Sequence, residues 1–277
     1  MFFRYACMVS AVCACLLMSS CSKTVDAIVV NPEDKLLKIA ESYAEGAATK
    51  VVLYADKSLT AGYNKVYVVL YDSVNSTQRT TNADVTLSPE MSMNMNGMTM
   101  KHGCPVDAPV YDATTKLFAG AVAFSMASTA CDSWSLAVKI NNNEHHKAGI
   151  ANFLLNVAAT TTSSIKSVTL SDGTKLTIAV IAPAKPVVGV NDLELAIYQK
   201  KDAYQYLPAT GYEVKQHVEM PSMGHGSPNN IDPVETSAGH YKGKVNYTMT
   251  GDWRINLDML TGGKAVSDGL YFDQNVQ

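Results

Sequence analysis

The sequence lacks the motifs that mark common enzymes and nucleic-acid-binding proteins. It has no Ser-His-Asp or Cys-His arrangement, no glycine-rich phosphate-binding loop and no paired-carboxylate motif. Its 22 basic and 25 acidic side chains nearly balance and form no basic run, which argues against a nucleic acid as partner. After the signal-like start, no apolar run approaches the roughly 20 residues that a transmembrane helix needs. We therefore expect neither an enzyme nor a nucleic-acid-binding protein.

The N-terminus is typical of a secretory signal peptide. Residues 1–20 contain one basic residue, Arg4, followed by an apolar run and by two serines directly before Cys21. The residues around Cys21 resemble the bacterial lipobox, which implies cleavage before Cys21 and attachment of a lipid to its thiol. We expect a cell-envelope protein that this lipid anchor holds at a membrane, facing the periplasm. The alternative is ordinary cleavage nearby, which leaves Cys21 free.

The rest of the chain repeats itself. Similar residues, with glycine, methionine and tryptophan among them, recur in the same order in two stretches. The matching segments are residues 49–53 and 174–178, 62–71 and 189–198, 90–91 and 219–220, 100–105 and 223–228, 118–126 and 241–249, and 134–138 and 253–257. Matches that keep their order in this way indicate a tandem duplication of one structural unit.

Apolar residues alternate with polar or small ones in both copies. The alternation is clearest over residues 66–70 and the matching residues 193–197. Such runs, broken by Asn, Asp, Gly and Pro, predict half-buried antiparallel strands, and several of them in one short stretch favour a sandwich. We therefore predict an all-β fold of two tandem immunoglobulin-like β-sandwich domains, with Trp134 and Trp253 in their cores.

The same patterns set the predicted boundaries. Between Asn31 and Gly46 apolar residues follow at helical spacing, which predicts a short helix. Residues 152–159 are apolar enough to form the first strand of the second copy. The predicted segments are a signal peptide at 1–20, a tether with the short helix at 21–47, a first sandwich at 48–141, a second sandwich at 150–260 and a C-terminal tail at 261–277.

Methionine and histidine gather at the same place in each copy. The first copy carries Met98, Met100 and His102 among further methionines, and the second carries Met220, Met223 and His225, with His240 before its next strand. Thioether sulfur is a soft, neutral ligand that favours Cu(I), and imidazole binds either oxidation state of copper. These residues are therefore the candidate copper ligands. The alternative is that the methionines fill the cores of the two sandwiches.

Three motifs of the second copy resemble a known family. Met-Pro-Ser-Met-Gly-His-Gly begins at Met220, Gly-His-Tyr-Lys-Gly at Gly239 and Gly-Asp-Trp at Gly251. In this order they resemble YtkA-like and FixH-like domains, which implies an immunoglobulin-like fold and a link to copper handling or metalloenzyme assembly. Carried over to this chain, the resemblance implies Met220, Met223 and His225 as ligands. The first copy lacks the proline and the Gly-x-Trp.

Two cysteines of the first copy have no counterpart in the second. Cys104 stands opposite Ser227, and Cys131 lies in a short insertion before Trp134. Because an exported protein meets an oxidising compartment, we expect a Cys104–Cys131 disulfide. The alternative is that one of the two thiolates binds copper.

Two functions remain open from the sequence. In the first, an envelope-anchored lipoprotein binds copper through its Met/His-rich loops and buffers the metal or delivers it to an envelope protein partner. In the second, the two immunoglobulin-like domains form a protein-interaction or adhesion module that binds no metal. The position of the methionines and histidines in Gly-rich segments favours the first.

Overall fold

The structure, a computed structural model, describes residues 31–95 and 97–277. The predicted signal peptide and the predicted lipidation site, Cys21, lie outside these residues. Contacts between Cα atoms group Asn31–Gln277 into one unit. Within the described part of the chain, no helix is long and apolar enough to cross a membrane.

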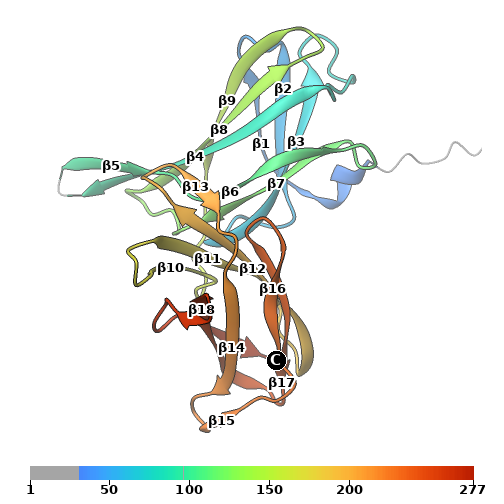
Figure 1. Cartoon of the computed structure of the whole chain (residues 1–277). Helices are drawn as coiled ribbons and strands as arrows, with labels where there is room; N and C mark the ends of the chain where they lie inside the picture. Colours follow the sequence, from blue (N-terminus) through green and yellow to red (C-terminus); the bar gives the residue numbers. More distant parts are fainter. Residues whose placement is uncertain (1–30, 96) are drawn as a thin grey trace, which may run out of the picture. The chain divides into compact units, whose positions relative to one another are not determined.

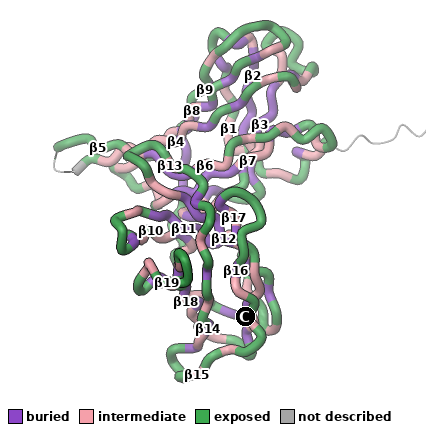
Figure 2. The backbone as a smooth tube through the Cα atoms, in the orientation of Figure 1, coloured by how far each residue is buried: buried purple, intermediate pink, exposed green. Residues whose placement is uncertain are grey.

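The first sandwich consists of two antiparallel sheets. One has the strand order β1 (Leu37–Ala44), β2 (Thr49–Ala55), β3 (Gly62–Asp72), β7 (Leu117–Phe124) and β6 (Val106–Asp112). The other has the order β5 (Met98–His102), β4 (Ala83–Met95), β8 (Ser133–Asn142) and β9 (Lys147–Leu155) (Figure 1). Alternate residues of these strands are buried and pack into one core (Figure 2). Leu53, Phe124 and Trp134 are fully buried in it.

The second sandwich repeats this architecture. Its first sheet has the order β10 (Ile165–Thr169), β11 (Lys175–Ala182), β12 (Gly189–Lys200), β17 (His240–Tyr247) and β16 (Ile231–Ser237), and β13 (Tyr206–Pro208) also pairs with β12. Its second sheet has the order β15 (His225–Gly226), β14 (Glu213–Met220), β18 (Gly251–Thr261) and β19 (Lys264–Ala265), and β20 (Tyr271–Val276) also pairs with β18. Tyr241, Trp253 and Phe272 are fully buried in its core.

Side chains at matching positions make equivalent hydrogen bonds in both sandwiches. Asn64 donates hydrogen bonds to the carbonyls of Gly62 and Thr60, and Asn191 donates to those of Gly189 and Val187. The indole Nε1 of Trp134 donates to the Met126 carbonyl, and that of Trp253 donates to the Met249 carbonyl, both over 3.0 Å. The predicted all-β fold of two sandwich domains is therefore confirmed, and both tryptophans lie in the cores as predicted.

The predicted helix between Asn31 and Gly46 is wrong. A single 3₁₀ turn, η1 (Pro32–Lys35), is followed by strand β1, which pairs with β2 along its whole length. The apolar residues there suit helical spacing, but pairing with the open edge of β2 supplies a partner for the backbone that an isolated short helix lacks.

Two predicted boundaries also differ from the structure. Residues 147–155 form β9, which pairs with β8 and belongs to the first sandwich, so the second sandwich begins later than predicted. The segment predicted as a tail, 261–277, contains β20, which pairs with β18 from Gly251 to Asn256 and buries Phe272 in the core. Both strands lie at the ends of their sheets, and pairing with a neighbouring strand, which the local sequence does not specify, decides which sandwich they join.

A polar cluster joins residues of the two sandwiches. Asp107 of β6 accepts hydrogen bonds from the hydroxyls of Tyr63 on β3 (2.6 Å) and Tyr198 on β12 (2.8 Å). His240 at the start of β17 places its Nε2 3.0 Å from Asp107 Oδ2. Apolar contact between Ala123 and Tyr198 lies beside these polar groups. The carboxylate of Asp107 in the first sandwich thus interacts with the Tyr198 hydroxyl and the His240 imidazole of the second.

Candidate metal sites

In the second sandwich, the hairpin between β14 and β15 brings Met220 and His225 together. The two residues are direct partners in the antiparallel register, which places their Cβ atoms roughly 4.5–5.5 Å apart on one face. The turn between them closes with the amides of Met223 (3.1 Å) and Gly224 (3.0 Å) donating to the Met220 carbonyl. Gly224 has a φ of +63°, which a residue with a Cβ rarely adopts. The Gly-rich segment thus folds back on itself and leaves Met223 60% exposed at the turn.

The imidazole of His225 has one nitrogen with a partner and one without. Its Nδ1 lies 3.1 Å from the Gly226 carbonyl oxygen. Since a carbonyl only accepts, the neutral ring carries its proton on Nδ1, and Nε2 keeps its lone pair. That Nε2 is buried and has no hydrogen-bond partner. A buried acceptor without a hydrogen-bond partner lowers the stability of the fold. In metal sites, the ligating histidine usually donates a hydrogen bond from its other ring nitrogen, as Nδ1 of His225 does here.

The first sandwich contains the same arrangement. His102 on β5 is the direct register partner of Met91 on β4, and Met91 is in turn the partner of Trp134 on β8. The Nδ1 of His102 lies 2.8 Å from the Gly103 carbonyl oxygen. The rings of His102 and Trp134 pack edge to face with their centroids 5.6 Å apart, and those of His225 and Trp253 pack in the same way with centroids 5.4 Å apart. Each sandwich therefore places a methionine, a histidine and a tryptophan on three neighbouring strands, with the two rings in contact.

Met91 and the two tryptophans are parts of these clusters that the ligand prediction omitted. The repeat already matched Met91 with Met220, and this match could have identified Met91. Met91 is fully buried and Met220 is 3% exposed. The predicted Met98 and Met100 lie on the same face of β5 as His102 but nearer the end of the hairpin, where they are 68% and 51% exposed.

The structure separates His240 from the other predicted ligands. It begins β17, whereas Tyr247 at the end of that strand packs against Trp253, the ring that His225 contacts. The rise of a strand places these two ends about 23 Å apart. His240 instead pairs with Asp107 and lies 3.8 Å from Glu194, and its hydrogen bond to Asp107 raises its pKa. The inclusion of His240 in the ligand set is therefore wrong.

The predicted Cys104–Cys131 disulfide is absent from the structure. Cys104 is a buried free thiol, and Cys131 is an exposed one in the turn before β8. Cys104 follows β5 and Cys131 precedes β8, and these two strands pair with opposite edges of β4, so a whole strand lies between them. Burial raises the pKa of the Cys104 thiol well above its usual value, which also disfavours a metal-binding thiolate.

Within the residues that the structure describes, no group of three or more His, Cys, Asp and Glu side chains is placed to hold a metal ion. A hard or borderline ion that needs several such ligands has no built site there. The methionine–histidine clusters offer soft, neutral ligands only.

Comparison with known proteins supports the resemblance of the second sandwich. The YtkA-like family model matches residues 171–258, from just before β11 to within β18. This range contains Met220, His225 and Trp253. The FixH-like resemblance and the lipoprotein character stay predictions. No curated protein matches the chain.

Solved structures with a similar fold are distant. The Escherichia coli adhesin FdeC is 16% identical, with 85% of this chain and 66% of that chain covered and a TM-score of 0.27. A conserved domain protein from Bacillus anthracis is 13% identical, with 88% and 92% covered and a TM-score of 0.32. InvD of Yersinia pseudotuberculosis is 15% identical, with 79% and 54% covered and a TM-score of 0.25. This chain spans less than two thirds of the FdeC and InvD chains, and these scores carry no argument about function.

Proposed function

We propose that this protein binds Cu(I) in the cell envelope, with one methionine–histidine site in each sandwich, and buffers the ion or delivers it to an envelope protein partner. The observation that carries the proposal is the Nε2 of His225, which is buried, has no partner and stands beside Met220. Met220 and His225 would hold the ion in the second sandwich, with Met223 from the turn as a third ligand. Met91 and His102 would hold it in the first.

The chemistry of the donor set selects Cu(I) among biological metals. Thioether sulfur binds soft ions and needs no deprotonation, and a neutral imidazole adds a nitrogen ligand. The carbonyls of Gly103 and Gly226 fix the histidine tautomer that leaves Nε2 free to bind. The indoles of Trp134 and Trp253, packed against these histidines, can add a cation–π attraction to a bound ion.

The proposed location rests on the N-terminal sequence. The signal-like residues 1–20 and Cys21 favour export and a lipid anchor, and with it a membrane as the first partner. A Cu(I)-binding module held at a membrane by a lipid anchor is consistent with buffering the ion or delivering it to an envelope protein.

The proposal is tested by titrating the purified protein with Cu(I) against a chromophoric Cu(I) chelator. We expect the H225Q and M220L variants each to lose the ion from the second sandwich while the first keeps its own. Leucine conserves the volume of Met220, so the fold tolerates the change. The matched control is M259L, because Met259 is a fully buried methionine of β18 without a histidine partner. Equal Cu(I) binding by M259L, H225Q and M220L would refute the proposal.

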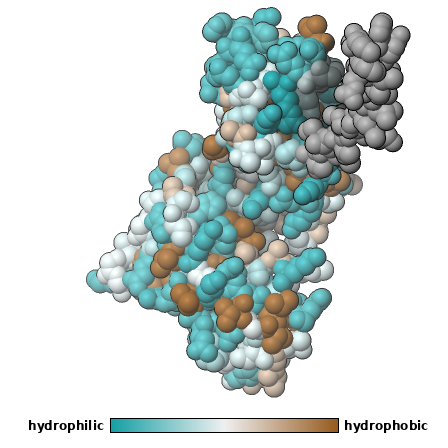
Figure 3. Space-filling view, turned by 90° about the vertical axis from the view of Figure 1, so that its right-hand side faces the viewer, coloured by the Kyte–Doolittle hydropathy of each residue, from teal (hydrophilic) through white to brown (hydrophobic). Residues whose placement is uncertain are grey.

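Exposed apolar side chains favour the protein-interaction module as the second candidate. Several lie on the second sandwich, namely Val187, Val188, Val190, Ile231 and Val234. One face of the molecule carries separate apolar groups among hydrophilic ones (Figure 3). If the protein competes with no chelator for Cu(I), this function remains, and the partner would be sought by cross-linking in the envelope.

A further inference from the structure

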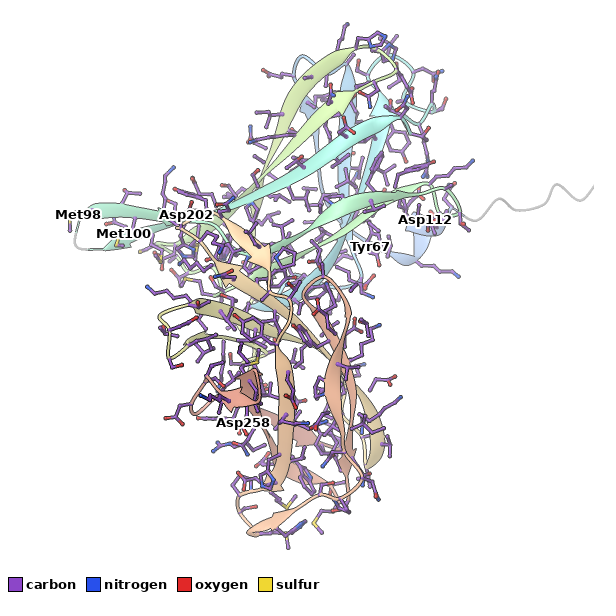
Figure 4. The ribbon with its side chains drawn as sticks, viewed as in Figure 1. Tyr67, Met98, Met100, Asp112, Asp202 and Asp258 are labelled. Atoms are coloured by element: carbon purple, nitrogen blue, oxygen red, sulfur yellow. The ribbon has the colours of Figure 1, made fainter. Side chains whose placement is uncertain are left out.

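The hairpin of β4 and β5 carries a row of methionines that continues outward from the first metal site. The register pairs Met91 with His102, Met93 with Met100, and Met95 with Met98. Alternate residues of a strand share one face, so Met91, Met93, Met98, Met100 and His102 lie in line on the same side of the hairpin. Figure 4 shows Met98 and Met100 on the part of this hairpin that extends away from the sandwich.

Core packing does not account for the outer members of the row. Met91 is fully buried and Met93 is half-buried, but Met100 is 51% exposed and Met98 is 68% exposed. Long apolar side chains at such a position contribute little to stability. Their exposure makes them accessible to another molecule.

The outer methionines are spaced for joint binding of one ion. Direct cross-strand partners such as Met93 and Met100 have Cβ atoms roughly 4.5–5.5 Å apart, and diagonal neighbours such as Met93 and Met98 lie within reach of long side chains. Each methionine has three rotatable bonds to adapt its sulfur. The charged pair Lys101–Glu90 (2.8 Å) belongs to the alternate positions of these strands, on the opposite face. The methionine face is therefore a set of neutral thioethers.

The second sandwich provides an internal comparison. Its strand β15 has only two residues, His225 and Gly226, so the hairpin ends directly at the histidine. The extended methionine row belongs to the first sandwich alone.

We propose that Met93, Met98 and Met100 form a second, exposed Cu(I) position, through which the first sandwich exchanges Cu(I) with a partner protein that presents its own thioether or thiolate ligands. This inference rests on the proposed Cu(I)-binding function and adds its route of exchange. The ion passes by ligand exchange: a Cu–S bond to a hairpin methionine forms as a bond to the partner's sulfur breaks. It then moves inward to His102 in the same way, and no electron or redox partner takes part.

The test is a competition titration with the Cu(I)–bicinchoninate complex as the donor. We expect the purified protein to bind one equivalent beyond the two methionine–histidine sites. The M93L/M98L/M100L variant should lose that equivalent and load the His102 site more slowly. The control is M126L, which removes a partly exposed methionine of the same sandwich outside the hairpin and leaves intact the Met126 carbonyl that Trp134 contacts.

A second measurement does not depend on variants. With ¹³C-labelled methionine methyl groups, the NMR signals of Met93, Met98 and Met100 should shift on addition of the extra equivalent of Cu(I), and that of Met126 should not. Unchanged hairpin signals, or a triple variant with the stoichiometry and loading rate of the natural protein, would overturn the exchange position while leaving the two inner sites intact. Absence of Cu(I) binding at His102 and His225 would instead overturn the proposed function.

Discussion

The cluster around Asp107 predicts a pH-dependent contribution to stability. Asp107 accepts two tyrosine hydroxyls and pairs with His240 at 3.0 Å, and the side chains of Asp107 and His240 are only 26% and 19% exposed. Removing one partner of such a pair leaves the other groups unsatisfied, so we expect D107A to lower the free energy of unfolding by about 3 kcal/mol. H240Q, which loses the charge and keeps a polar group, should cost about 1–2 kcal/mol.

The sign of the pH dependence follows from the two pKa shifts. The hydrogen bond to Asp107 raises the pKa of His240 above its usual 6.5, although burial opposes it. The contribution of charged His240 is therefore present below pH 6.5 and is lost as the pH rises through the higher folded pKa. Burial alone would raise the pKa of Asp107, but hydrogen bonds from His240, Tyr63 and Tyr198 lower it below 3.8. Between pH 3.8 and 6.5 each group of the pair is therefore more than half charged in the folded protein.

Urea denaturation at several pH values measures this contribution. The stability difference between the natural protein and H240Q should be largest near about pH 5 and shrink well above the folded pKa of His240. H145Q is the matched control, because His145 pairs with Asp72 over the same 3.0 Å at the surface, where solvent screens the pair and the effect is much smaller. If H240Q and H145Q show the same small, pH-independent difference, the reasoning about the Asp107 cluster is refuted.

Three further predictions concern single residues. Y247F should raise the free energy of unfolding by about 1 kcal/mol, because the Tyr247 hydroxyl is buried without a hydrogen-bond partner. The first sandwich has Phe124, which carries no hydroxyl, at the matching buried position. A loss of stability in urea would contradict this prediction. G149A should lower the free energy of unfolding by about 2 kcal/mol, because a Cβ at this position would clash with the Glu45 carbonyl and lie 2.8 Å from the Ala47 amide nitrogen. An unchanged denaturation midpoint would count against the packing of β1 on β9. A thiol reagent should label Cys131 in the folded protein and Cys104 only after unfolding, as mass spectrometry of labelled peptides would show; resistance of both thiols until a reductant is added would restore the disulfide.

Much of the fold was predictable because the chain repeats itself. The matched segments contain β2, β3, β7 and β8 and their counterparts, where apolar alternation and a buried tryptophan mark each copy. The strands that the prediction missed, β1 and β20, and the strand that it assigned to the wrong sandwich, β9, lie at the ends of sheets. Their pairing partners decide their conformation, and a local pattern does not contain that information.

The candidate sites were predictable only in part for the same reason. The sequence identified Met220 and His225 because they stand close together along the chain, and His102 because it follows Met98 and Met100 closely. It did not reveal that Met91 faces His102 across β4 and β5, since register is a long-range property. His240 was misplaced because nearness in sequence to a motif says nothing about which end of a strand a residue occupies. The cysteines were paired because both lack a counterpart in the second copy and the compartment was expected to be oxidising, and neither argument fixes the distance between them.

The most direct test of the central claim is NMR of the histidine ring nitrogens, with and without Cu(I). The chain has six histidines, and all of them lie in the described residues. The account predicts that the neutral rings of His102 and His225 carry their proton on Nδ1, and that their Nε2 signals alone shift when Cu(I) is added. Unchanged signals from His102 and His225, or equal shifts at His145, His146, His217 and His240, would contradict a Cu(I) site in each sandwich.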